Sequence, residues 1–173
     1  MAIDTGIGIS LSLVTKTRQA PLGQTVLKPA GIDGNGESTY IYVSYIATAV
    51  PVDLVIGNVV GHATGALGYA DVRRALAAPN ADPGTVVGVT QNAWTWLTHY
   101  PLGAGAADEL FGFVQRTGVG KVLQLAGATV DEGLIASLTA GSATGVAAVT
   151  DASFATAGTT GVGTLDCKIH CKG

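Results

Sequence analysis

Between Gly84 and Gly133 the chain is a succession of short apolar segments cut by glycine, with almost none of the residue types used in catalysis. The segments begin at Thr85, Ala93, Leu110 and Lys121. Short, glycine-bounded runs of β-branched and aromatic residues are typical of strands. We therefore predict an all-β, or mostly β, fold built as a small β-barrel or sandwich.

The beginning of the chain predicts an extended N-terminal arm, residues 1–23. From Gly6 to Thr17 apolar side chains alternate with small or polar ones, which indicates a strand with one apolar face. That face consists of Ile7, Ile9, Leu11 and Leu13. We expect its open edge to pair with a neighbouring subunit or with a larger assembly that the protein joins, so these four residues are interface candidates.

Residues 24–173 predict a single β-rich domain with long loops, and the prolines at 79–83 mark a candidate boundary that we interpret as a loop. A turn signal at Asp33–Gly36 predicts a β-hairpin between the apolar segments on either side. Tyr69–Ala78 is the best candidate for a short helix or an ordered loop, and Leu102–Glu109 is expected to be a surface loop.

Charged residues are scarce. Asp, Glu, Lys and Arg make up 12% of the chain, compared with about 25% in typical soluble domains. Two explanations are open for such an uncharged, apolar composition. Part of the surface is buried in an assembly, or the many small residues raise the mean hydropathy without any partner. Only Arg73 and Arg74 are adjacent basic residues, which argues against nucleic-acid binding. No apolar run of about 18 residues predicts a membrane span. The N-terminus lacks the cationic segment of a secretory signal, so we expect synthesis in a cytoplasm.

Both cysteines lie in the alternating run Thr164–Cys171, which predicts a strand. On this strand Cys167, Ile169 and Cys171 share one face, and His170 points to the other. Residues four apart on a strand are about 13 Å apart, too far for a disulfide. We expect buried free thiols that act as small apolar side chains, and no metal site.

The segment that begins at Ala93 predicts an aromatic strand with Trp94 and Trp96 on one face. Three alternatives stay open for this pair: the domain core, a subunit interface, or stacking against a ligand such as a sugar. Both tryptophans are therefore further interface candidates.

No complete catalytic motif is present, and we expect neither an enzyme nor a cofactor. Gly118–Lys121 resembles the end of a phosphate-binding loop. However, Gln115 stands where that motif needs its first glycine, and Val122 replaces the Ser or Thr that would hold magnesium. A tight β-turn is the better interpretation of these glycines.

Four motifs follow one another along the chain: Val-Gly-Val-x-Gln at 87–91, Phe-Gly-Phe-Val-Gln-x-x-Gly at 111–118, Val-x-x-Gly at 130–133 and Gly-Val-Gly-Thr-Leu at 161–165. In this order they resemble the head decoration (cement) proteins of tailed bacteriophages. The resemblance implies a structural virion protein on the capsid exterior, a homotrimer that bridges subunits of the major capsid protein. The chain departs from the family pattern in its longer loop, Pro101–Glu109, and its Cys-containing tail.

A second hypothesis is a phage head-fibre, tail or receptor-binding protein, in which the two tryptophans would form a glycan-contacting face. A third is an enzyme such as a polysaccharide depolymerase, for which only scattered carboxylates speak. Binding to capsids that lack the protein favours the first hypothesis, and binding to a glycan array favours the second.

Overall fold

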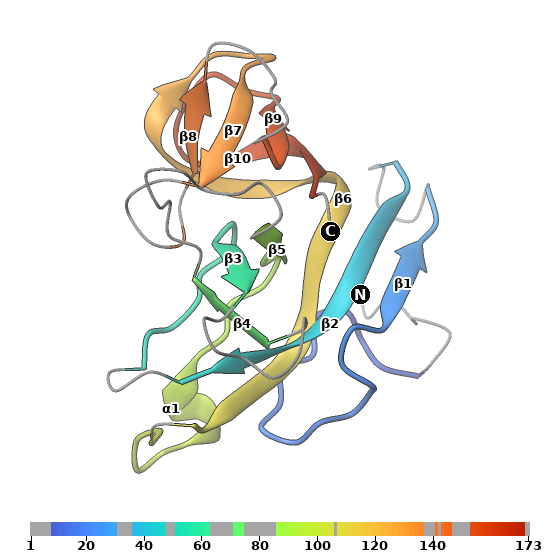
Figure 1. Ribbon diagram of the computed structural model, residues 1–173, viewed down its shortest axis with the longest axis vertical. Helices are drawn as coiled ribbons and strands as arrows, with labels where there is room; N and C mark the ends of the chain where they lie inside the picture. The colour runs from blue at the N-terminus through green and yellow to red at the C-terminus, as the bar shows by residue number, and fades with distance from the viewer. Residues whose placement is uncertain are drawn as a thin grey trace.

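The computed structural model describes residues 8–30, 36–47, 51–62, 71–74, 86–105, 107–136, 141, 143–146 and 153–171. Within these ranges the chain forms ten strands and one short helix, which confirms the mostly β prediction (Figure 1). The strands are β1 (Thr25–Lys28), β2 (Ser38–Ile46), β3 (Val59–His62), β4 (Asp71–Arg74), β5 (Val86–Val89), β6 (Glu109–Ala128), β7 (Gly133–Ala136), β8 (Ala143–Val146), β9 (Ala155–Ala157) and β10 (Gly161–His170). The helix α1 spans Trp96–His99.

Strand β6 connects the two halves of the molecule. It is 20 residues long and pairs antiparallel with β2 along Glu109–Thr117 and with β10 along Thr117–Ala128. Figure 1 shows it bending between β2 and β10, with β7, β8 and β9 gathered around its second half. One mostly antiparallel sheet results, in the order β1-β2-β4-β3-β5-β6-β10-β9-β7-β8.

The sheet folds back on β6 in both halves but is not a closed barrel. Strand β5 meets β6 through the single pair Val89 and Gln115, and β8 meets it through Gln124 and Ala143. A barrel needs a continuous ladder of hydrogen bonds around its circumference. The expected closed β-barrel is therefore wrong, although the expected mostly β architecture holds.

The glycines at 118–120 lie inside β6 and not in a tight β-turn, which corrects the sequence interpretation. Gly118 has a φ of 96°, a conformation that favours glycine. The buried side chain of Gln115 donates from Nε2 to the carbonyl oxygens of Thr117 (2.9 Å) and Val119 (3.1 Å). These two hydrogen bonds bind the backbone carbonyls at the point where β6 changes its partner from β2 to β10. We infer that they stabilise the bend and so allow one continuous strand.

Two apolar cores lie on either side of β3 and β5. The first contains Val59 and Val89 together with buried residues of β6 to β10. The second contains Val60 and Val87 together with Leu54, the two tryptophans and buried residues of β2 and β6. In β3 the adjacent Val59 and Val60 thus point into different cores, as the period of two requires. In β5 the register shift against β3 breaks this period, so that Val87 and Val89 also lie in different cores. The two halves are therefore packed together as well as joined by β6.

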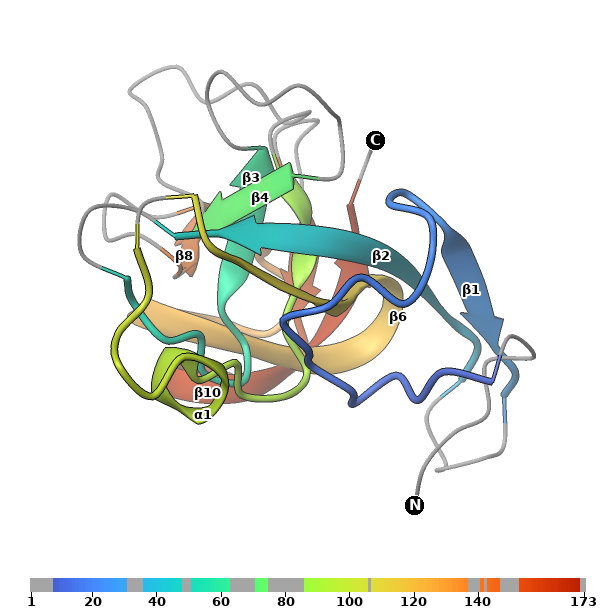
Figure 2. The same ribbon diagram turned by 90° about the horizontal axis from the view of Figure 1, so that it is seen from below.

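The described part of the N-terminal arm is not a strand, contrary to the prediction for Gly6–Thr17. The backbone turns at Ser10–Leu13, where the amide of Leu13 donates to Ser10 (3.1 Å). Thr15 then forms an isolated bridge with Phe111 of β6, with hydrogen bonds of 3.0 and 2.7 Å. This segment lies alongside β2 and β6 of its own domain (Figure 2).

Leu11 packs into a third buried cluster with residues of the adjacent segments and strands, namely Ala20, Val26, Tyr40, Tyr42, Phe111 and Phe113. The expected pairing of the arm with a neighbour assumed an alternating strand with a free edge. The turn at Ser10–Leu13 replaces that alternation, because Leu11 is buried more favourably against these aromatic rings than on an open edge.

One other expectation for local structure is corrected. Residues 71–74 of the expected helix or loop Tyr69–Ala78 form β4, because β2 and β3 offer them strand edges on both sides. The candidate boundary at 79–83 and the remainder of Tyr69–Ala78 lie outside the described residues.

The expected β-hairpin is confirmed by the antiparallel pairing of β1 with β2. Its central turn residues, 31–35, lie outside the described part of the chain.

We expect Gly118→Ala to destabilise the fold more than Gly163→Ala. A Cβ on Gly118 would overlap Ser38 Oγ and lie 2.7 Å from the carbonyl oxygen of Glu37, whereas a Cβ on Gly163 meets no atom within 4 Å. Both changes add backbone strain of about 1–3 kcal/mol, because both glycines have a positive φ. The overlap should add at least about 1 kcal/mol for Gly118. Urea unfolding of both variants measures the difference, and equal losses would contradict the steric role.

Leu11→Ala should lower the free energy of unfolding by about 2 kcal/mol, because it leaves a cavity in the third cluster. Leu13→Ala is the matched control, since this neighbouring leucine is partly exposed and outside the cluster. Its loss should stay within about 0.5 kcal/mol. An unchanged urea midpoint for Leu11→Ala would show that the N-terminal segment is only loosely attached.

Candidate functional site

Trp94 and Trp96 lie in the core, with exposed fractions of 0% and 3%. Trp94 forms an isolated backbone bridge with Leu54, and α1 begins at Trp96. The expected aromatic strand is wrong beyond Trp94, because Asp53 Oδ1 accepts the backbone N–H of Trp96 (2.8 Å) where the helix starts. The indole N–H of Trp96 donates to the carbonyl of Val52 (3.0 Å). Of the three alternatives, the geometry supports the core.

The four interface candidates of the arm do not form one exposed face. Leu11 is buried, Ile9 is half-buried, and Leu13 is partly exposed. Ile7 lies outside the described residues. The surface that this chain offers to a partner must therefore be sought elsewhere.

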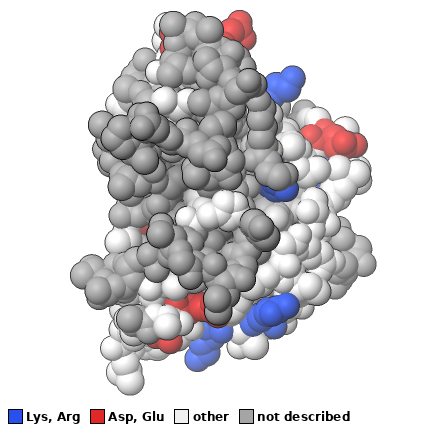
Figure 3. Space-filling model, in the orientation of Figure 1, with Lys and Arg blue, Asp and Glu red and all other residues white. Residues whose placement is uncertain are grey.

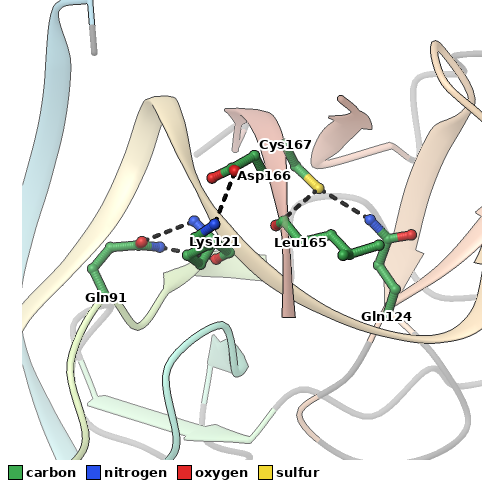
Figure 4. A network of polar contacts seen from close by, with 6 residues as sticks. All are labelled: Gln91, Lys121, Gln124, Leu165, Asp166 and Cys167. Carbon is green, nitrogen blue, oxygen red and sulfur yellow. Dashed lines mark hydrogen bonds and ion pairs between the residues drawn. The ribbon is translucent and has the colours of Figure 1, made fainter. Parts of the chain in front are cut away.

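The two cysteines are free and buried, Cys167 in β10 and Cys171 directly after the last residue of that strand, in agreement with the predicted burial. Cys167 Sγ accepts a hydrogen bond from Gln124 Nε2 (3.1 Å) and donates to the carbonyl of Leu165 at 3.6 Å (Figure 4). Burial raises the pKa of Cys167 above its usual value and raises that of Cys171 to about 12. In the described ranges no three His, Cys, Asp or Glu side chains are grouped to hold a metal ion.

Large apolar side chains are exposed at ten positions of the described chain. They are Leu13, Leu27, Val55, Ile56, Leu97, Leu102, Val119, Leu125, Val130 and Val162. Single exposed apolar residues are common on soluble proteins, but grouped ones indicate binding sites. Two such groups can be defined here: an open groove next to the β6–β10 pair, and a projection that follows α1.

The groove is an open depression of about 500 Å³, which we call the Lys121 groove. Its lining comes from four separate segments of the chain and consists of Val55, Ile56, Ala93, Lys121 and Thr164. It is thus mostly apolar, with one cation.

Backbone contacts hold the walls of the Lys121 groove in place. The side-chain amide of Gln91 takes the place of a neighbouring strand: its Oε1 accepts the N–H of Lys121 (2.9 Å) and its Nε2 donates to the carbonyl of Lys121 (3.0 Å; Figure 4). The carbonyl of Gly57 accepts the N–H of Leu123 (2.8 Å). A Cβ on Gly57 would lie 2.7 Å from that nitrogen, so the loop can approach β6 this closely only with glycine.

The groove continues into the outer face of β6 and β10. Thr164 stands opposite Leu123, and Asp166 stands opposite Lys121, whose Nζ lies 2.8 Å from the Asp166 carboxylate. Alternate residues of β10 from Val162 to Lys168 are exposed. Both charges of the ion pair belong to this face, so they largely cancel each other towards a partner.

The projection consists of residues 97–102. Leu97 has 66% of its surface exposed and Leu102 has 104%. Leu102 is this exposed because it lies in a turn, which is closed by the hydrogen bond from Gly103 N–H to the Tyr100 carbonyl (2.9 Å). The base of the turn is fixed, since the Tyr100 hydroxyl donates to the carbonyl of Glu109 (2.9 Å). The leucines are therefore presented by an anchored loop, in agreement with the surface loop expected from Leu102 onwards.

Charge is sparse around these features. The sequence contains no Asp, Glu, Lys or Arg between Asp82 and Asp108. In the view of Figure 3 the charged side chains form small, separated groups with uncharged surface between them. No helix of the described chain is long and apolar enough to cross a bilayer.

No protein-family model matches the chain, and no curated protein matches its sequence. The function of the surface is therefore inferred from the chain's own residues. The groove had no local signal in the sequence, because its residues come together only when four segments fold. The one local hint is Gln91, the last residue of the Val-Gly-Val-x-Gln motif.

We expect both thiols to resist modification in the folded protein at pH 8, because the reactive thiolate is scarce and the sulfurs are buried. An aromatic disulfide reagent should label them slowly in buffer and rapidly in urea, with Cys171 the slower. The unfolded Cys171 ionises near pH 9.0, and the folded one near 12. Stability should therefore be unaffected below pH 9 and fall as the pH rises from 9 to 12. Rapid labelling at pH 8 would contradict the packing of β10.

Proposed function

We propose that the protein is a structural component of a tailed-phage virion that decorates and stabilises the capsid exterior. In this function it bridges subunits of the major capsid protein and acts as a homotrimer rather than as an enzyme. The order of the motifs at 87–91, 111–118, 130–133 and 161–165 resembles the decoration family and is the first support. The observation that carries the proposal is the mostly uncharged, partly apolar outer surface held on a firmly connected sheet.

The outer face of the β6–β10 pair is the surface that we assign to the capsid. Val162 is 61% exposed, and Val119 and Leu125 are partly exposed on the paired strand. Strands present their alternate side chains as a broad surface, which suits contact with a large shell. Binding across several capsid subunits would stabilise the shell by mass action, with no chemical step.

The glycan-binding alternative loses its support, because it depended on exposed rings of Trp94 and Trp96. Both indoles are buried, and Trp96 donates its N–H to the backbone. A stacking platform for a sugar requires an accessible aromatic face.

Capsids that lack the protein should bind it with saturation and should then retain their DNA at higher temperature. Val162→Asp is expected to weaken binding about tenfold or more, because it places a carboxylate in the contact. Val130→Asp is the matched control, since Val130 is similarly exposed but lies in the turn before β7. Cosedimentation with capsids and a heat challenge measure the two effects. Failure of the wild-type protein to bind would remove the proposal.

A further inference from the structure

We infer that the Lys121 groove of one copy receives the leucine projection, residues 97–102, of a second copy of this chain. This contact deepens the proposed function, because it rests on the self-association stated there and names the surfaces that make it. The groove adjoins the outer face of β6 and β10 that we assign to the capsid, so the two contacts lie next to each other on the surface.

The projection has the properties of an inserted side chain. Leu102 is the most exposed large apolar residue of the described chain, and Leu97 follows it. Neither contributes to the cores of its own chain, so the exposure of these leucines has no explanation in the isolated fold. Their loop is anchored by Tyr100, so little conformational freedom is lost when they are buried.

The groove has the complementary properties. Its apolar walls, Val55, Ile56 and Ala93, can surround an aliphatic side chain, and its volume of about 500 Å³ leaves room for more than one methyl group. Its cation, Lys121, is already paired with Asp166 at 2.8 Å. A charged occupant would lose its hydration and find no unpaired charge in the groove to compensate for that loss. An uncharged leucine loop has no such cost.

The lack of charge on the projection matches the apolar groove and favours a second copy as the occupant. The projection belongs to the stretch between Asp82 and Asp108, which contains no Asp, Glu, Lys or Arg. Every copy carries both a groove and a projection, so copies can associate through the same contact repeated around a symmetry axis. The low charge of the chain is then explained in part by surface that is covered between copies.

The test uses two variants that each remove one side of the contact. Leu102→Asp removes the projection, and Ile56→Asp places a carboxylate in the groove. By analytical ultracentrifugation the wild-type chain should be an oligomer, and each variant alone should associate at least about tenfold more weakly. Mixed in equal amounts, the variants should form a one-to-one pair, because Leu102 of the Ile56→Asp copy can still enter the intact groove of the Leu102→Asp copy.

Val130→Asp is the control for an added charge outside both features and should sediment like the wild type. Thermal melting of every variant establishes that it is folded. A wild-type monomer at all concentrations, or variants that fail to pair when mixed, would overturn the inference. Weaker capsid binding by Ile56→Asp in a monomeric protein would assign the groove to the capsid instead. Self-association without capsid binding would leave this contact standing and would remove only the proposed function.

Discussion

One buried amide determines whether this chain has one long strand or two short ones. Gln115 binds the carbonyls of Thr117 and Val119, where the backbone of β6 would otherwise leave polar groups unpaired next to two cores. Only because those carbonyls are satisfied can β6 change direction and pair first with β2 and then with β10. A Cβ on Gly120 would overlap the same amide oxygen. The side chain and the glycines therefore form one structural unit.

The strands with clear alternation were predictable from the sequence, as β10 shows: Cys167 in this strand and Cys171 directly after it are buried, as expected. The errors arose where a distant segment decides the local structure. Asp53 binds the backbone at Trp96 and starts a helix, and aromatic rings of β2 and β6 bury Leu11 and turn the arm. The Lys121 groove could not be predicted, because the residues that line it come from four segments that meet only in the folded chain. Local pattern records none of these contacts.

The distribution of large side chains separates the task of folding from that of recognition. The two tryptophans, for which core, interface and ligand stacking were all open, fill the second core. There Tyr45 packs against Trp94 and Trp96 with ring centroids 6.2 and 5.5 Å apart. The aliphatic residues Leu97, Leu102 and Val162 remain outside instead. Each indole buries a large apolar surface, and its N–H has a partner inside the fold: Asn92 Oδ1 for Trp94 and the carbonyl of Val52 for Trp96. The two rings therefore stabilise the fold, and the exposed aliphatic groups remain for contacts.

The side chain of Gln91 has a further consequence beyond shaping the groove. It occupies both backbone hydrogen-bonding groups of Lys121 on an edge of β6 where none of the described strands pairs with that residue. An open edge on a protein with so little charge would invite uncontrolled strand pairing between molecules, and so fibrous aggregates. By closing that edge with a side chain, the fold keeps the neighbouring apolar surface available for specific contacts while the backbone at Lys121 offers no template for strand pairing. Many copies can thus be present at a high local concentration, with their apolar surfaces exposed, without pairing through this edge of β6.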